Sequence, residues 1–485
     1  MQQKSMIRNA IYNVLYTGIN LLFPLITMPY VSRVLGASNL GQVDFTKSIV
    51  NWFLLLASFG VTTYGVREIA RNREDRDKRS QVFIELMTIN GFLSLAMTVV
   101  YILLVLNLPS TSVNSTLLLI FALNIILNMF NIDWFYQGLE EYSFITIRNA
   151  IIKLLSLLSI FLLIREQDHY ILYGLIIVLG TTLNSVLNFI HSRKFVTFKL
   201  REFAPFRHLK KLSIFFTISI VISIYINLDR TLLGFIVGPT AVAFMTRGKT
   251  IIDAATLFST SISNVAMPRA SHYIKTDIAK FNNLLSIVPN FILWITIPIT
   301  FGVFILSYDI MYILGGEEFI QATNLLKVLS MTIILSPLST YMNYQVLVPT
   351  GNEGYALRTS IFASITSLIL NLLLIPSIGV IGAGISLVLA EIVVFVTRYI
   401  TIRRTLGYNR LNFINRSTIS YLIVSIFMGI IILSIRTFIN DLYVSFIVVS
   451  IVGAIVYFLT LILIKEQVTT LVISKVANKI PFVKI

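Results

Sequence analysis

Ionisable side chains stand inside stretches of this sequence that are long and apolar enough to cross a membrane. In GQVDFTKSIVNWFLLLASFG (41–60), Asp44 and Lys47 lie three residues apart at the edge of one such stretch. A charge at mid-bilayer costs about 2.5–3.5 kcal/mol on insertion scales, so such a residue usually faces a bundle interior or a watery cavity. These positions therefore predict either a passage for a charged solute or ion pairs between helices.

The predicted chemistry is electrostatic, because the expected intramembrane cations outnumber the anions. An unpaired anion crossing an apolar medium would meet a barrier on the order of tens of kcal/mol before relaxation, and a hydrated cationic lumen removes most of it. Lys327 and Glu391 also fall inside predicted spans. The candidate substrate-binding cations are Lys47, Arg148, Lys153, Arg230, Arg247 and Lys249. The candidate ion-coupling residues are Asp44, Asp133, Asp229 and Asp253.

Some of these residues have an alternative role as structural ion pairs. Asp44 can pair with Lys47 across three residues, and Asp253 with Lys249 across four, because both spacings place side chains on one helical face. Such pairs would hold helices without taking part in transport. The spacing alone favours neither role.

Neighbouring candidates cannot all face the same spot. Asp229 and Arg230 are adjacent, so their side chains point about 100° apart on a helix. Arg230 shares its face with other polar residues and is expected to face the lumen, whereas Asp229 is a candidate proton or sodium site. Arg148 and Lys153 point about 140° apart, so at most one faces squarely inward unless the lumen is wide.

Uncharged polar residues also follow single helical faces. The first predicted span carries Asn13, Thr17, Asn20, Pro24 and Thr27, and a later span carries Asn124, Asn128 and Asn131. Both stripes fit the wall of a lumen, and both fit hydrogen bonds between packed helices equally well.

The composition is that of an integral membrane protein. The 485 residues are 56% hydrophobic and only 12% charged, whereas soluble domains carry about 25% charged residues. No polar stretch exceeds roughly twenty residues, which is too short for a soluble domain with its own core. Basic cytoplasmic loops account for the net charge of +16, so nucleic acid is not expected as a partner.

The sequence lacks the groups that common enzyme classes need. Cysteine is absent, which excludes thiolate nucleophiles and thiolate metal sites. The four histidines show no metal-ligand spacing, and no GxxxxGK[ST] phosphate-binding loop occurs. We therefore expect no enzymatic activity, no metal and no cofactor, with coupling to H⁺ or Na⁺ as an open alternative.

Fourteen helical spans are predicted, because strands in lipid would need a closed barrel of short alternating segments. They are roughly 11–32, 42–66, 81–107, 115–137, 144–164, 170–191, 212–237, 242–266, 284–307, 321–346, 356–375, 381–402, 416–438 and 442–464. Most of the 38 Lys and Arg residues fall in one set of loops, which places both termini in the cytoplasm. The first apolar run is too long for a signal peptide and is interpreted as a retained span.

The two halves of the chain repeat. VLGASNLGQVDFTKSI (34–49) aligns without gaps to IVGPTAVAFMTRGKTI (236–251), GLEEYSF (138–144) matches GNEGYAL (351–357), and YGLIIVLG (173–180) matches AGISLVLA (383–390). Three matches in order, at shifts between 202 (34 to 236) and 213 (138 to 351), predict two parallel six-helix lobes. The predicted parts are 1–195 for the N-lobe, 196–211 for a basic cytoplasmic linker, 212–404 for the C-lobe, and 405–485 for two added spans and a tail.

These features resemble a known transporter family. Two six-span lobes, two extra C-terminal spans, VLG near the first outside loop and WFYQGLEEY (134–142) are similar to the Wzx-type polysaccharide repeat-unit flippases for O-antigen or capsule. That group belongs to the multidrug/oligosaccharidyl-lipid/polysaccharide (MOP) exporter superfamily. The resemblance implies an all-α polytopic fold, like that of the MATE transporters, in the bacterial cytoplasmic (inner) membrane. It also implies movement of undecaprenyl-diphosphate-linked oligosaccharide from the cytoplasmic to the outer leaflet by alternating access, for surface polysaccharide biosynthesis.

The partners that the resemblance implies are a lipid-linked oligosaccharide diphosphate and membrane lipids. Polysaccharide assembly enzymes are an alternative partner for the basic loops. A multidrug cation exporter of the same superfamily is a competing function, but it should offer anionic and aromatic lumen residues, and here cations prevail. A polysaccharide polymerase or glycosyltransferase would need catalytic carboxylates on a sizeable exposed loop, and the predicted outside loops are short.

Overall fold

A computed structural model describes residues 6–107, 113–197, 203–405, 407 and 411–477. Within these ranges every regular element is a helix, which confirms the expected all-α polytopic fold. The chain forms two compact units, Met1–Thr246 and Arg247–Ile485. The predicted lobe limits stay a prediction, because packing assigns α8 (Leu209–Ile236) to the first unit.

Eleven helices among the described residues are long and apolar enough to cross a membrane. Two of them each combine two spans across a kink: α1 (Met6–Ser58) bends at Gly36, and α14 (Glu353–Ile400) bends at Gly379. A further helix, α9 (Pro239–Thr276), is 38 residues long but more polar, and it is not among the eleven. These elements are compatible with fourteen spans, and that total stays a prediction.

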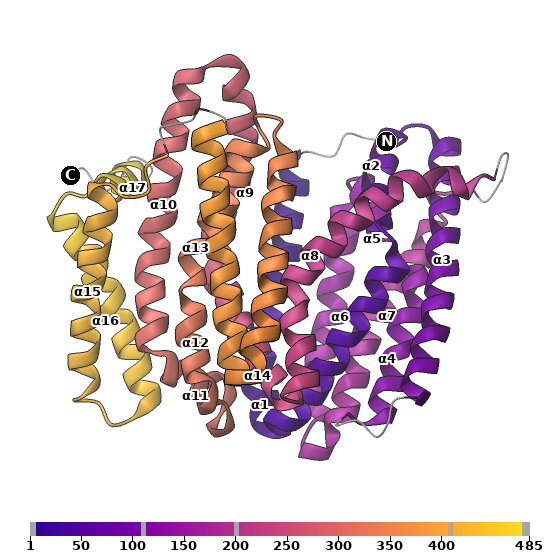
Figure 1. Ribbon diagram of the computed structural model, residues 1–485, viewed down its shortest axis with the longest axis horizontal. Helices are drawn as coiled ribbons and strands as arrows, with labels where there is room; N and C mark the ends of the chain where they lie inside the picture. The colour runs from indigo at the N-terminus through magenta and orange to yellow at the C-terminus, as the bar shows by residue number, and fades with distance from the viewer. Residues whose placement is uncertain (1–5, 108–112, 198–202, 406, 408–410, 478–485) are drawn as a thin grey trace. The chain divides into compact units, whose positions relative to one another are not determined.

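The first unit is built around α1. Its other elements are α2 (Val61–Arg71), α3 (Arg76–Asn107), α4 (Ser115–Leu127), η1 (Asn128–Phe130), α5 (Asp133–Gly138), α6 (Tyr142–Leu163), η2 (Gln167–His169), α7 (Tyr170–Ser192), η3 (Pro205–His208), α8 and the start of α9. α1 packs on α3, α4, α6 and α8 (Figure 1). Gly36 and Gly238 have φ values of 74° and 117°, which glycine adopts without strain, at the predicted repeat shift (36 to 238).

The WFYQG motif forms most of α5, a short buried helix that packs on α2. Trp134 is 2% exposed and lies against Gly65, where an added Cβ atom would come within 2.4 Å of the indole. A Cβ atom added at Gly138 would likewise come within 2.8 Å of the Ile69 side chain. The motif is therefore part of the apolar core, where each large side chain contributes about 1.5–3 kcal/mol on burial.

The second unit is built around α10 (Ile278–Ile305). Its other elements are the remainder of α9, α11 (Ser307–Gly315), η4 (Glu317–Ala322), α12 (Thr323–Ser330), α13 (Thr332–Tyr341), the π-helical η5 (Met342–Leu347), α14, η6 (Thr401–Thr405), α15 (Arg416–Arg436), α16 (Leu442–Leu463) and α17 (Gln467–Ala477). The two added spans, α15 and α16, pack on each other and on α10 (Figure 1). The Tyr457 hydroxyl donates to the Trp294 carbonyl oxygen at 2.9 Å, which joins α16 to α10.

One turn repeats in the backbone before α6 and before the first half of α14. The N–H of Glu140 donates to the carbonyl of Gln137 at 3.1 Å, and the N–H of Gly351 donates to that of Val348 at 3.0 Å. Glu140 and Gly351 both have positive φ, 58° and 71°. The two turns correspond at a shift of 211 (140 to 351), two less than the predicted alignment of GLEEYSF with GNEGYAL.

Candidate functional site

Arg148 and Asp133 form an ion pair inside the first unit. Arg148, on α6, is 7% exposed, and its Nη2 lies 3.3 Å from Oδ1 of Asp133 at the start of α5. The Asp133 carboxylate also accepts hydrogen bonds from the Tyr16 hydroxyl, at 3.4 Å, and from the side-chain amide of Asn188. A predicted substrate-binding cation and a predicted ion-coupling anion are thus in direct contact.

The guanidinium of Arg148 keeps unused hydrogen-bond donors. Its Nε and Nη1 are buried and have no acceptor in the described part of the chain. The guanidinium carbon, Cζ, of Arg148 lies 5.7 Å from the centre of the Phe144 ring. A buried donor without an acceptor costs about 1–3 kcal/mol, so an additional acceptor such as a phosphate oxygen would be stabilised here.

Lys153 lies five residues further along α6 and has different neighbours. Its Nζ is 4.3 Å from the centre of the Phe23 ring of α1, a cation–π contact. The charge of Lys47 acts on Lys153, so these two cations are close enough to repel each other. No carboxylate pairs with Lys153 among the described residues. As expected from their angular separation, Arg148 and Lys153 do not share one set of contacts.

The polar stripe of the first span is divided between two roles. Asn20 accepts a hydrogen bond from Asn149 of α6 at 3.3 Å, which joins the two helices. The hydroxyls of Thr17 and Thr27 donate to carbonyls of their own helix, to Asn13 at 3.0 Å and to Phe23 at 3.0 Å. This stripe therefore serves partly in helix packing.

The later stripe favours the packing role more strongly. Asn128 is 6% exposed, and its side-chain amide donates to Oδ1 of Asn90 at 3.1 Å and to the Ser94 hydroxyl at 3.3 Å. Asn90 donates in turn to the Asn128 carbonyl at 2.8 Å. Such bonds between transmembrane helices average about 0.6 kcal/mol each.

Two hydrogen bonds fix the second half of α1 on α8. Trp52 Nε1 donates to the Thr231 hydroxyl at 2.9 Å, and Thr231 donates to the Ser48 hydroxyl at 3.4 Å. Lys47 directly precedes Ser48 in the sequence and is exposed, and Arg230 directly precedes Thr231 and is half buried. Arg230 keeps a buried Nε without an acceptor in the described part of the chain.

The other two acidic candidates of the first unit differ in burial. Asp229 is 4% exposed and accepts the backbone N–H of Arg230 at 2.7 Å. Asp44 is half buried on α1. A buried carboxylate inside the membrane is costly, so it is expected either to pair with another group or to serve as an ion site.

Arg247, Lys249 and Asp253 belong to the second unit. All three lie on α9, where Arg247 is 7% exposed, Lys249 is half buried and Asp253 is exposed. The predicted convergence of Lys47 and Lys249 on one lumen joins residues of different units and stays a prediction.

Comparison with known families identifies the chain. Residues 6–274, more than half of the sequence, match the family described as "Polysaccharide biosynthesis protein". The chain belongs to this family. Its relatives include the "Putative O-antigen transporter" of Escherichia coli (strain K12), 24% identical over 404 residues that cover 80% of this chain and 95% of the relative.

Solved structures share the fold of this polysaccharide biosynthesis protein. "Lipid II flippase MurJ, inward closed conformation" superposes with a TM-score of 0.75 at 16% identity, covering 95% of this chain and 99% of that one. An inward-facing multidrug resistance MATE family transporter of the MOP superfamily superposes at 0.58 and 15% identity, covering 82% and 99%. The fold is thus that of the MOP exporters, as the resemblance predicted.

This family member also carries a buried arginine that the sequence reasoning missed. Arg398, on the second half of α14, is 9% exposed and donates to the Ser339 carbonyl at 2.8 Å and to the Thr359 hydroxyl at 3.2 Å. In the repeat, Arg398 corresponds to Asn188 (shift 210) and Thr359 to Arg148 (shift 211). Each unit therefore has a buried arginine, Arg148 on α6 in the first and Arg398 on α14 in the second. Arg398 falls inside the predicted span 381–402, and a charge inside an apolar span is the signal that could have found it.

A second missed cluster ties the segment before α8 to α3. Glu85 is fully buried and lies 2.7 Å from Nη2 of Arg207 and 2.7 Å from Nε2 of His208. It also accepts the backbone N–H of Ala204 at 3.1 Å. The other ring nitrogen of His208 is 2.8 Å from the Tyr64 hydroxyl. These residues are far apart in sequence, so no spacing pattern pointed to the cluster.

Proposed function

We propose that this polysaccharide biosynthesis protein is a flippase that carries a lipid-linked oligosaccharide diphosphate across the membrane. The carrying observation is a pair of cations on α6 in the first unit, Arg148 and Lys153. There, Arg148 keeps buried N–H donors without acceptors, and Lys153 has no carboxylate partner among the described residues. The name of the O-antigen transporter relative and the fold shared with MurJ support the same function.

The chemistry of these two cations suits a diphosphate. A lipid-linked diphosphate carries about two negative charges, whose transfer into an apolar medium costs on the order of tens of kcal/mol before relaxation. Arg148 offers a planar fork of donors that matches phosphate oxygens, and Lys153 offers a point charge. Because Lys47 and Lys153 repel each other, an anion bound near them relieves that repulsion.

The resemblance to the Wzx-type flippases implies the finer parts of the proposal. The lipid is undecaprenyl, and the direction is from the cytoplasmic to the outer leaflet by alternating access of the two lobes. The protein lies in the bacterial cytoplasmic membrane. Both of its termini are on the cytoplasmic side, as the distribution of Lys and Arg predicts. An H⁺ or Na⁺ gradient acting on Asp44, Asp133, Asp229 or Asp253 supplies the drive, and assembly enzymes contact the basic loops.

Export of cationic drugs is the weaker alternative. The likeness to a multidrug MATE transporter is a likeness of fold. A cationic drug would be repelled by Lys47 and Lys153, whose charges already act on each other.

A reconstituted leaflet assay tests the proposal. Vesicles holding only the purified full-length protein receive a fluorescent polyprenyl-diphosphate oligosaccharide, and a membrane-impermeant reductant reports the fraction left in the outer leaflet. Lys153→Gln should slow equilibration about tenfold or more, the value of one charge-assisted hydrogen bond, and Lys153→Arg should retain most of the rate. The Lys47→Ala/Lys249→Ala double variant tests the symmetry-related pair.

The matched control is Lys275→Gln, because Lys275 is an exposed cation at the far end of α9. Its rate should equal that of the parent protein. Equal rates for the parent, Lys153→Gln and the double variant would remove these three lysines from the mechanism, and no transport by the parent protein would overturn the function.

A further inference from the structure

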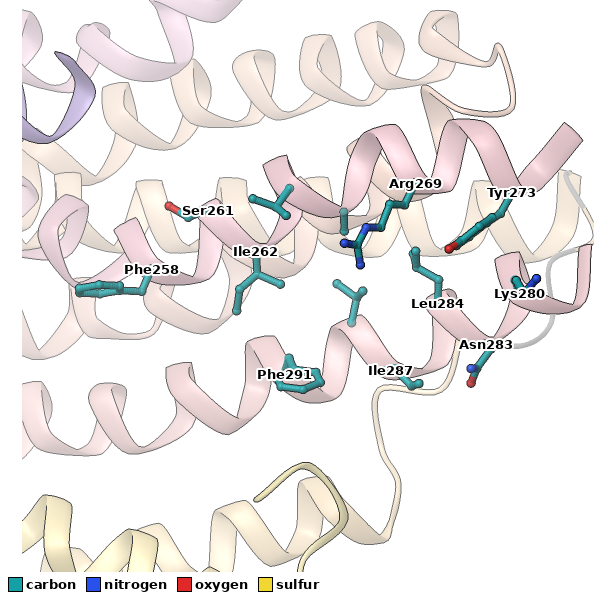
Figure 2. A pocket seen from close by; sticks show the side chains of 13 residues that line it. Phe258, Ser261, Ile262, Arg269, Tyr273, Lys280, Asn283, Leu284, Ile287 and Phe291 are labelled. Carbon is teal, nitrogen blue, oxygen red and sulfur yellow. The ribbon is translucent and has the colours of Figure 1, made fainter. Parts of the chain in front are cut away.

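A cavity of about 630 Å³ opens between α9 and α10 in the second unit (Figure 2). It lies apart from every candidate of the sequence analysis, since none of those residues lines it. Its two walls are consecutive helices of one hairpin, joined through Asp277. The shape of the site is therefore set within a single supersecondary unit.

The lining of the cavity changes character from one end to the other. One end is apolar, with Phe258 on α9 and Phe291 on α10. The other end carries Lys280 and Asn283, while Arg269 and Tyr273 extend from α9 into the space between the helices (Figure 2). An apolar slot with a cationic, hydrogen-bonding head is the complement of an amphiphile with an anionic head.

The length of the slot matches one leaflet of a bilayer. Phe258 and Arg269 are eleven residues apart on α9, which corresponds to about 16 Å of helix. Half of a hydrocarbon core about 30 Å thick is about 15 Å. The basic end lies where α9 ends and α10 begins, a connection whose positive charge predicts it to be cytoplasmic, so the slot runs from headgroup depth toward mid-bilayer.

The charge at the basic end matches a single phosphodiester. Arg269 is exposed and pairs with no carboxylate in the described ranges, whereas Lys280 is 3.0 Å from Asp277. The charges of Lys280 and Asp277 offset each other, so Arg269 is the lining cation whose charge is left over, and it matches the single charge of one phosphodiester. A lipid-linked diphosphate, with about two negative charges, is the poorer match.

We propose that the α9–α10 cavity is a binding site for an anionic glycerophospholipid of the cytoplasmic leaflet. Its phosphate contacts Arg269 and Tyr273, and an acyl chain lies between Phe258 and Phe291. The site is additional to the proposed transport path. Its occupant would hold the hairpin of α9 and α10 at a fixed spacing, because it fills the gap between them.

Quenching of a tryptophan placed in the cavity tests the site. Phe291→Trp puts an indole at the apolar end, and the difference from the parent protein removes the signal of the three native tryptophans. In mixed vesicles, acyl-brominated phosphatidylglycerol should quench this indole at a mole fraction about five- to tenfold lower than brominated phosphatidylcholine. Arg269→Gln in the same background should remove that preference, and Lys275→Gln should leave it unchanged.

The readout is binding, so it does not depend on transport by the parent protein. Equal quenching by the two phospholipids, or a preference that survives Arg269→Gln in a protein with unchanged helicity, would overturn the proposal. A polyprenyl diphosphate that relieves the quenching at lower mole fraction than unlabelled phosphatidylglycerol would also overturn it, since the cavity would then belong to the carrier lipid. Ala266→Phe in the same background, which narrows the cavity without touching its charges or adding an indole, should weaken quenching by both phospholipids.

Discussion

Nε2 of His208 lies 2.7 Å from Oε2 of Glu85, in a buried contact between the segment that precedes α8 and the body of α3. The first turns of α3 also bind the chain where the predicted linker (196–211) begins. Arg79 Nη2 donates to the Phe195 carbonyl at 2.7 Å, and the Thr197 N–H donates to the Ser80 hydroxyl at 2.9 Å. The predicted basic linker is therefore fastened to the first unit at both of its described ends.

Removal of the Glu85 carboxylate should loosen this fastening. Glu85→Ala leaves His208 and Arg207 without their shared acceptor, and the lost hydrogen bonds to the carboxylate should cost about 1.5–3 kcal/mol. The measurement is the free energy of unfolding in detergent, together with protease cleavage in the 196–211 segment. Tyr64→Phe, which removes one hydrogen bond to His208, should cost only about 1 kcal/mol. Equal and small losses of unfolding free energy in both variants would show that the Glu85 contacts do not hold this segment on α3.

A double variant separates binding from packing at Arg148. Arg148→Gln alone leaves Asp133 without its cation, so it should lower both stability and transport. Asp133→Asn combined with Arg148→Gln should restore stability to within about 1 kcal/mol, because two neutral amides replace the ion pair. If Arg148 binds the diphosphate, transport in the leaflet assay stays at least tenfold reduced in the stable double variant. Recovered transport would assign the pair to packing alone.

The added spans should depend on one ion pair. Arg436 Nη2, at the end of α15, lies 2.7 Å from Oδ1 of Asp309 on α11, which is 2% exposed. Burial raises the pKa of Asp309 above its usual value, even though Arg436 pulls it down. Arg436→Ala should destabilise the protein by about 3–5 kcal/mol at pH 8, where Asp309 is left charged and unpaired. The loss should shrink as pH falls, because the raised pKa favours uptake of a proton by that carboxyl, and a loss independent of pH would contradict this account.

Glu466 should make stability fall in acid. Burial alone would raise its pKa, but hydrogen bonds from the Thr469 N–H and the Tyr421 hydroxyl, at 2.9 and 2.8 Å, lower the pKa below its usual value. Because the folded-state pKa is depressed, the contribution is complete above the unfolded value of about 4.3 and is lost as pH falls through the folded value. Thermal unfolding of Glu466→Gln should show a lower Tm than the parent at pH 7 and a smaller difference near pH 3.

Packing of the WFYQG motif predicts a sharp difference between two glycine substitutions. Gly65→Ala would place a methyl group 2.4 Å from the Trp134 ring, an overpacking that costs about 1–3 kcal/mol. Gly18→Ala, on α1, meets no atom within 4 Å and should be neutral or stabilising by up to about 1 kcal/mol. Both values come from unfolding in detergent. A tolerated Gly65→Ala would show that α2 and α5 can move apart at no cost.

Much of the fold was predictable from composition and periodicity. Apolar runs of bilayer length force helices, because lipid leaves the backbone no other hydrogen-bond partners. The repeat was predictable as well, because Gly36 and Gly238 align with each other. Both have a positive φ, a backbone conformation that favours glycine. The register of the GLEEYSF match was two residues off, because the turn is defined by backbone hydrogen bonds and Glu140 adopts it without being glycine.

The amino-acid sequence by itself determined that this is an all-helical membrane protein with cations and anions inside its apolar stretches, since length, hydropathy and charge are local properties of the chain. Only the tertiary structure decided how those cations are used. Asp133 and Arg148 are fifteen residues apart and Glu85 and His208 more than a hundred, and in each pair the helix packing brings the two together. Pairing needs side chains within about 4 Å, a distance set by three-dimensional packing that spacing along a sequence does not contain.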